Sequence, residues 1–313
     1  MNKRLESWRV LAAYFILFTC ASAACARSGT GDSFSGAEAF AYLRRVVAFG
    51  PRPPGSAALA ACRRWVVHEL QLDGCKVELD PFVASTPDGE IRMVNIIAKI
   101  PGSSPSVIML AGHYDTKLEK HFRFVGANDG GSSTAFLLEM ARVLGKQKQR
   151  DTIWLVFFDG EEAIRSWSAT DGTYGSRQLA AKLTSSGELS RIRAMILVDM
   201  IAGKHLEIHP DAASTQWLTK LVFRTARRLG YEKYFANNQP TALGDDHTAF
   251  VNDGVSAVDI LGPVGPVELG DFFGIDWHTA EDTLEHCSPH SLEIVGRVVT
   301  AVLDEIEHSS GSH

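Results

Sequence analysis

The stretch TIWLVFFDGEE, residues 152–162, joins a run of large apolar side chains to three acids. A continuous apolar run of this length is typical of a strand that is buried on both faces, as strands of a parallel sheet are. Glu161 and Glu162 therefore stand where a strand leaves a core. Two adjacent glutamates on a surface helix would carry no information, but two acids at this place indicate a site.

The rest of the chain repeats the pattern of buried strands between helices. Further apolar runs of strand length lie at residues 93–100, 107–115, 194–201 and 255–261. Helical apolar spacing is found at residues 34–49, 56–73, 131–145, 176–183, 214–230 and 291–308. This alternation predicts a three-layer α/β/α fold with a twisted, largely parallel central sheet. The length of 313 residues and the lack of internal repeats predict a single domain over residues 30–308.

The overall composition argues against nucleic acid as a partner. Apolar residues make up 45% of the chain and charged residues 22%, which is ordinary for a globular protein. The formal net charge is −6, and no basic stripe with interleaved aromatic residues is present.

The first residues differ from the rest and predict export. MNKR is basic, residues 10–26 carry no charge, and ASAACA supplies small residues of the kind that precede signal cleavage. We therefore expect residues 1–26 to be a signal peptide and the mature protein to be secreted or periplasmic. The alternative is a retained membrane anchor, because the uncharged run approaches the ~17 residues that a spanning helix needs.

The cysteines do not form a disulfide scaffold. After the first segment only Cys62, Cys75 and Cys287 remain, which is few for a domain of this size. Cys62 and Cys75 flank a predicted helix and are placed to pair in an oxidising compartment, which would leave Cys287 free. Pairing and free thiols both stay open at this point.

Polar side chains end three of the predicted strands. These are His113 and Asp115 after the first, Asp159, Glu161 and Glu162 after the second, and Asp199 at the end of the third. Ligands of open α/β sheets bind beyond the carboxyl ends of the strands. Any one of these residues alone is more simply explained as a cap or a turn residue, but together they predict a site at that edge.

The residue types favour a metal centre. Walker, GxGxxG, GxSxG and HExxH motifs are absent, and what remains is a scattered set of His, Asp and Glu. Asp129 stands immediately before a predicted helix, where the simple alternative is a helix N-cap. His278 lies beside Trp277, where the alternative is a surface histidine. Mixed carboxylate and imidazole ligation suits Zn²⁺, with three protein ligands and one open position in catalytic sites.

The two adjacent glutamates then have different tasks. Successive side chains point in different directions, so Glu162 can bind the metal while Glu161 faces the open position. A glutamate beside a cation that it does not bind is placed for general acid–base catalysis.

Several motifs together resemble a known family. EEA…W…D…YGSRQLAAK, from Glu161 onward, and GDDHTAF, from Gly244, resemble segments specific to the animal-type glutaminyl cyclases. GHYDTK, VGANDGGSSTAFLLEMARVL, VDMI and DWHTAEDT are shared with the di-zinc aminopeptidases of the same fold superfamily. The resemblance covers nearly the whole chain after residue 49. Gly112, Gly130 and Gly131 depart from it, since the animal cyclases carry a cysteine and bulkier residues there.

The resemblance implies a function and a set of site residues. It implies conversion of the N-terminal glutamine of peptides or proteins to pyroglutamate with release of ammonia. The implied residues are Asp129, Glu162 and His278 for a single zinc ion, Glu161 for proton transfer, Asp199 and Asp245 for an acid network, and Trp167, Phe273 and Trp277 for the substrate pocket.

A di-zinc aminopeptidase is the alternative. All five of its ligands have counterparts in this chain, at His113, Asp129, Glu162, Asp199 and His278, and spacing cannot count metals. His113 is therefore a candidate ligand of a second metal or a group behind the first. The insert AIRSWSATDGT, residues 163–173, and the segment around Asp245 favour the cyclase.

Overall fold

The computed structural model describes residues 33–236, 244–267 and 273–309, and every structural statement refers to these residues. The helices are α1 (Gly36–Val47), α2 (Ala57–Leu72), α3 (Gly131–Leu144), α4 (Tyr174–Ser186), α5 (Gln216–Arg228), α6 (His247–Asn252) and α7 (Pro289–His308). The strands are β1 (Lys76–Thr86), β2 (Gly89–Ile100), β3 (Val107–His113), β4 (Thr152–Phe158), β5 (Ile192–Asp199) and β6 (Ala257–Leu261).

The strands form one mixed, mostly parallel sheet, in the order β1-β2-β4-β3-β5-β6. The pairs β4–β3, β3–β5 and β5–β6 are parallel, whereas β1 and β2 run antiparallel to their neighbours. The predicted fold class and all five predicted strands are confirmed. Strand β1 was not predicted, because only Asp80 and Ala84 of its 11 residues are buried and this edge strand has no continuous apolar run.

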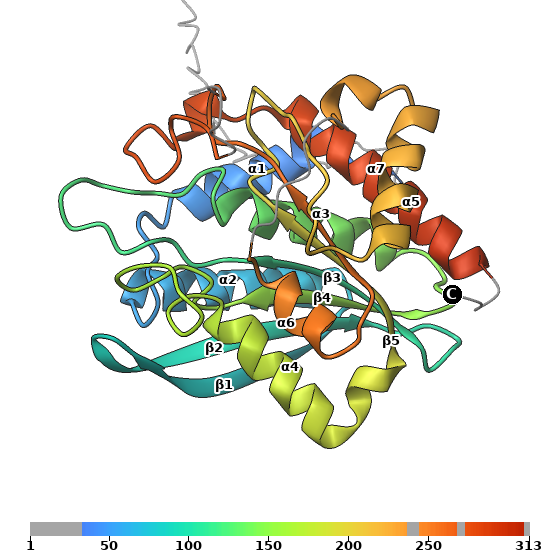
Figure 1. Cartoon of the computed structure of the whole chain (residues 1–313), viewed down its shortest axis with the longest axis horizontal. Helices are drawn as coiled ribbons and strands as arrows, with labels where there is room; N and C mark the ends of the chain where they lie inside the picture. The colour runs from blue at the N-terminus through green and yellow to red at the C-terminus, as the bar shows by residue number, and fades with distance from the viewer. Residues whose placement is uncertain (1–32, 237–243, 268–272, 310–313) are drawn as a thin grey trace, which may run out of the picture. The chain divides into compact units, whose positions relative to one another are not determined.

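Helices cover both faces of the sheet, which gives three layers (Figure 1). Helices α1, α2, α3, α5 and α7 pack on one face, and α4 and α6 on the other. Side chains along β3 alternate between the two cores, as Ile108 and Leu110 join the first and Met109 and Ala111 the second. The central strands are therefore buried on both faces, which explains their continuous apolar sequence.

Two glycines allow α3 to begin close against the end of β3. A Cβ atom on Gly112 would lie 2.5 Å from the Cβ atom of Ser133 in the first turn of α3. Gly130 has φ of +72°, and a Cβ there would lie 2.4 Å from the carbonyl oxygen of Asp115. Only glycine fits both positions without strain. This close approach fixes Asp129, directly before Gly130, next to the end of β3.

Two predictions concern the cysteines and the N-terminal segment. Cys62, Cys75 and Cys287 are all buried and free, so the possible Cys62–Cys75 bridge is not formed. The predicted signal peptide, residues 1–26, lies outside the described residues. None of the helices in the described ranges is long and apolar enough to span a membrane.

Candidate active site and metal centre

The predicted site residues gather around one cavity at the carboxyl edge of the sheet. Its volume is about 470 Å³. Its lining includes Asp129, Glu161, Glu162, Trp167, Asp199, Asp245, Phe273, Trp277 and His278. His113 is not in the lining, because it is buried beneath, with 1% of its surface exposed. The parallel strands β4, β3 and β5 are neighbours, so their ends deliver these side chains to one place.

Asp129, Glu162 and His278, here called the metal triad, are placed to hold a metal ion. The Nε2 atom of His278 lies 3.3 Å from Oδ2 of Asp129 and 3.2 Å from Oε1 of Glu162. One ligand atom from each residue lies within 4.8 Å of the other two. Zinc–ligand bonds of ~2.0–2.2 Å in a tetrahedron place ligand atoms about 3.4 Å apart, so this donor set fits zinc.

The electrostatics of the triad agree with a cation at its centre. Burial alone would lower the pKa of His278, but contacts with Asp129 and Glu162 raise that pKa to about 9. Burial raises the pKa of Glu162, and the negative charge of Asp129 adds to the increase. Two carboxylates held this close at neutral pH need positive charge beside them, which the protonated His278 supplies in the metal-free protein and a bound metal ion would supply in its place.

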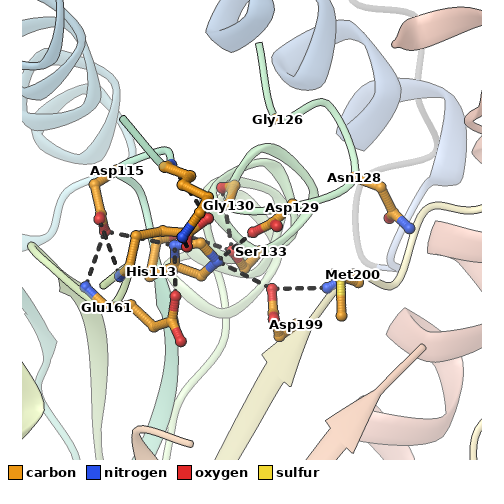
Figure 2. A network of polar contacts seen from close by, with 12 residues as sticks. His113, Asp115, Gly126, Asn128, Asp129, Gly130, Ser133, Glu161, Asp199 and Met200 are labelled. Carbon is orange, nitrogen blue, oxygen red and sulfur yellow. Dashed lines mark hydrogen bonds and ion pairs between the residues drawn. The ribbon is translucent and has the colours of Figure 1, made fainter. Parts of the chain in front are cut away.

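His113 stands at the centre of a second group of acids (Figure 2). Its Nε2 atom lies 3.1 Å from Oδ1 of Asp199 and 3.2 Å from Oδ1 of Asp129. On its other side, Nδ1 lies 3.5 Å from Asp115 and 3.8 Å from Glu161. His113, Asp129 and Asp199 are also close enough together to hold a metal, so Asp129 belongs to two candidate groups.

Asp115 holds the backbone of both glutamates, and their side chains then have different neighbours. Its Oδ1 atom accepts a hydrogen bond from the backbone N–H of Glu161 at 3.2 Å, and its Oδ2 from that of Glu162 at 3.3 Å. The side chain of Glu162 belongs to the metal triad and faces His278. Its carboxylate also accepts a hydrogen bond from the backbone N–H of Lys117 at 3.1 Å. The Glu161 carboxylate stays outside that triad, and burial raises its pKa well above the usual value. A raised pKa makes a carboxylate a better proton acceptor near neutral pH.

Asp199 and Asp245 are both buried beside Glu161 in the cavity. Burial, together with the negative charge of Asp199, raises the pKa of Asp245 to about 6. Asp199 accepts from the backbone N–H of Met200 at 2.8 Å through the same Oδ1 that faces His113. At least one carboxyl of such a pair holds a proton over part of the physiological pH range.

More acids lie behind this pair than the sequence predicted. Asp246 and Asp259 are buried, and burial raises the pKa of each well above its usual value. Asp211 contacts the buried His247, whose Nε2 lies 2.9 Å from Oδ2 of Asp211. The DDH triplet at residues 245–247 could have indicated Asp246 and His247 as part of the site. Asp259 lies within strand β6, and its sequence context gave no sign that it belongs to the site.

Asp282 ties the two loops of the metal triad together. Its carboxylate accepts hydrogen bonds from the backbone N–H groups of Asn128 at 2.7 Å and Asp129 at 3.0 Å. It stands four residues after His278, so one loop supplies a metal ligand and braces the other. The sequence did not single out Asp282, because these contacts join residues more than 150 positions apart.

Aromatic rings form part of the cavity wall. The ring of Trp277 stacks on His278 with centroids 3.8 Å apart and on Phe273 at 4.2 Å. Trp167 also lines the cavity, although half of its surface is exposed. The structure thus brings the three predicted aromatic residues to the cavity that holds the metal triad.

Both simple alternatives for Asp129 and His278 are wrong. Gly130, and not Asp129, is the N-cap of α3. The side chain of His278 is 18% exposed and faces two carboxylates, so it is no ordinary surface histidine. His278, Met200 and Thr173 are the described non-glycine residues with positive φ. Met200 and His278 line the cavity, and such backbone strain often marks a functional site.

Asp159 gives the fold a testable dependence on pH. It is fully buried, and burial together with the charge of Asp115 raises its pKa to about 7. An unfolded aspartate titrates near ~3.9, so the unfolded chain ionises first. The stability that the protonated carboxyl contributes is full below ~3.9 and is lost as the pH rises toward about 7.

We expect Asp159→Asn to remove this loss. Between these two pKa values the variant gains about 1.4 kcal/mol per pH unit in free energy of unfolding relative to the wild type. Denaturant unfolding of the metal-free protein at several pH values measures the difference. The exposed Asp304→Asn serves as the control. Parallel pH curves for wild type and Asp159→Asn would contradict the prediction.

Comparisons with known proteins agree on a family. The sequence profile described as Peptidase family M28 matches residues 95–303. The glutaminyl-peptide cyclotransferase of Bos taurus is 30% identical over 294 residues, which cover 82% of this chain and 79% of that protein. The crystal structure of an Acidobacteriales bacterium glutaminyl cyclase superposes with a TM-score of 0.83 at 40% identity, covering 90% of this chain and 97% of that one.

A relative with a different name shares the fold. The crystal structure of a Zn-dependent exopeptidase from Parabacteroides distasonis superposes with a TM-score of 0.78 at 28% identity. It covers 88% of this chain and 99% of that one. The same architecture thus carries more than one described activity.

Proposed function

The chain belongs to peptidase family M28, and from this membership and its site we infer that it is a zinc-dependent glutaminyl-peptide cyclotransferase. The enzyme converts the N-terminal glutamine of a peptide or protein to pyroglutamate and releases ammonia. The observation that carries this function is the position of Glu161. It is a buried acid outside the metal triad, in the same cavity as that triad and the aromatic wall.

We assign the single zinc ion to Asp129, Glu162 and His278. When bound, zinc polarises the γ-amide carbonyl of the substrate glutamine as a Lewis acid. We do not assign a second zinc ion to the neighbouring group of His113, Asp129 and Asp199, in which His113 and Asp199 would instead take part in proton transfer. In its support, Oδ1 of Asp199 is already engaged by the backbone N–H of Met200 and by His113.

The residues of the cavity divide the remaining work. Trp167, Phe273 and Trp277 enclose a slim glutamine side chain and leave the free α-amine next to Glu161. The amine nitrogen forms a bond to the γ-carbonyl carbon and closes a five-membered ring. Glu161 takes the proton that the amine loses and delivers it to the γ-nitrogen as the carbon–nitrogen bond breaks, so ammonia departs. One protonated carboxyl of the pair Asp199 and Asp245 orients Glu161 or the departing nitrogen.

A di-zinc aminopeptidase remains the competing function, because the second group of possible ligands favours it. The two functions give different products and different metal contents. The purified protein is incubated with a peptide that begins with glutamine, and the products are analysed by mass spectrometry. Loss of one ammonia with one zinc per chain supports the cyclase. Release of free amino acids with two tightly bound zinc ions per chain would favour the aminopeptidase.

We also propose that the protein is exported and that its substrates are peptides or proteins outside the cytoplasm. The basic start, the uncharged segment and the small residues of positions 1–26 support a signal peptide. Retention of that segment would instead tether the enzyme to the membrane. N-terminal sequencing of the protein from the culture medium or periplasm, compared with the membrane fraction, distinguishes the two.

A further inference from the structure

The loop between β4 and α4 brings Trp167 to the catalytic cavity. Residues 163–173 contain neither a helix nor a strand, and an isolated bridge between Ser168 and Asp171 is their only ladder contact in the described chain. Half of the Trp167 surface is exposed. Something other than regular structure must therefore fix the position of this side chain.

One buried carboxylate inside the loop accepts four hydrogen bonds, three of them from backbone N–H groups of the loop itself. Asp171 is 3% exposed. Its Oδ1 accepts from the backbone N–H of Ile164 at 2.7 Å and from the Tyr174 hydroxyl at 2.8 Å. Its Oδ2 accepts from the backbone N–H groups of Arg165 and Ser166, each at 3.0 Å. The carboxylate thus gathers the three residues that lead into Trp167 and anchors them to the first residue of α4.

The other end of the loop supports the indole ring directly. A Cβ atom on Gly172 would lie 3.0 Å from two carbon atoms of the Trp167 ring, so the ring rests on the glycine backbone. The carbonyl of Gly172 accepts from Arg177 of α4 at 2.9 Å, and the N–H of Thr173 donates to the carbonyl of Glu161 at 2.7 Å. Asp171 and Gly172 therefore join the aromatic wall to the backbone of the catalytic glutamate.

Trp167 stands between two hollows. The catalytic cavity of about 470 Å³ lies on one side, and a second hollow of about 580 Å³ between α4 and α6 lies on the other. Trp167, Gly244 and Asp245 belong to the lining of both. A displaced indole would open the catalytic cavity toward the second hollow and widen the space meant for a slim side chain.

We propose that Asp171 is a positioning residue that holds Trp167 as a wall of the substrate pocket and so sets the affinity for the N-terminal glutamine. This inference rests on the proposed cyclase function. The burial of Asp171 would by itself raise its pKa, but the three backbone N–H groups and the Tyr174 hydroxyl lower that pKa below its usual value. The residue therefore acts as a charged acceptor throughout the working pH range.

The test compares Asp171→Ala, Trp167→Ala and the double variant in cyclisation of a glutamine-initiated peptide. We expect each single variant to raise KM by about 10- to 100-fold, since small misplacements in a pocket have effects of this size. The double variant should be no worse than the more impaired single variant, because an absent ring cannot be positioned. Zinc per chain should stay at the wild-type value. Asp151→Ala, a buried aspartate at the opposite end of β4, should leave KM unchanged.

Two results would overturn the inference. One is a wild-type KM for Asp171→Ala when Trp167→Ala is impaired, and the other is a double variant whose loss equals the product of the single losses. If Asp171→Ala does not fold, Asp171→Asn takes its place, since it keeps one acceptor oxygen and removes the charge.

A fluorescence measurement separates this inference from the proposed function. If the wild type does not cyclise the peptide, the proposed function fails, but the structural role of Asp171 is still measurable. Asp171→Ala should increase acrylamide quenching of tryptophan fluorescence, and this increase should vanish in a Trp167→Phe background. An increase that persists without Trp167, or no increase at all, would refute the positioning role.

Discussion

Glu161→Gln should lower kcat by about 10²- to 10⁴-fold while zinc stays bound. The change keeps the shape of the side chain and removes its ability to accept a proton. The carboxylate of Glu161 is not part of the metal triad, and the backbone N–H that Asp115 holds is unaffected. Steady-state kinetics with a glutamine-initiated peptide and elemental analysis of the same preparation measure the two quantities together.

The pH dependence supplies an independent check on the same step. The attacking amine must be unprotonated, and a peptide α-amine has a pKa near ~7.7–8.0. Wild-type kcat/KM should therefore rise with pH through that range. In Glu161→Gln the rise caused by the amine should remain, because it belongs to the substrate, while the whole curve is lower. Full activity of a zinc-replete Glu161→Gln enzyme would end the proton-transfer role.

The fold was predictable where burial on both faces imposes a continuous apolar run. Strands β3, β4 and β5 lie in the middle of the sheet, and their sequences leave little room for polar residues. Strand β1 was missed because a mostly exposed edge strand that contains Pro81 lacks that signal. Helix α6 was missed because its six residues are too few to show a helical period.

The site was predictable as far as strand ends point to it. The polar ends of β3, β4 and β5 converge because parallel neighbours share one carboxyl edge. Asp129 and His278 lie outside the strands; their residue types made them candidate metal ligands, and the resemblance then grouped them with Glu162 as the zinc ligands. Asp282 and Asp259 act through contacts between distant parts of the chain, which a single sequence does not reveal.

Glu162→Gln should lose the metal as well as the activity. The substitution removes the negative charge from one of three ligands and leaves the oxygen or the nitrogen of a neutral amide in its place. Substitution of a residue that only orients a ligand lowers metal affinity by ~10–100-fold. We therefore expect substitution of the ligand Glu162 itself to lower zinc affinity by at least about 100-fold. Titration of the metal-free protein with zinc against a competing chelator measures the affinity.

The two glutamates serve as controls for each other, since they are neighbours, both buried and changed in the same way. If the assignment is right, Glu162→Gln weakens zinc binding and Glu161→Gln does not, although both substitutions abolish most of the turnover. Excess zinc should restore part of the activity of Glu162→Gln and none of that of Glu161→Gln. The reverse pattern, with zinc lost from Glu161→Gln and kept by Glu162→Gln, would exchange their roles. Such an exchange would also contradict the 3.2 Å approach of Glu162 to His278 on which the metal triad rests.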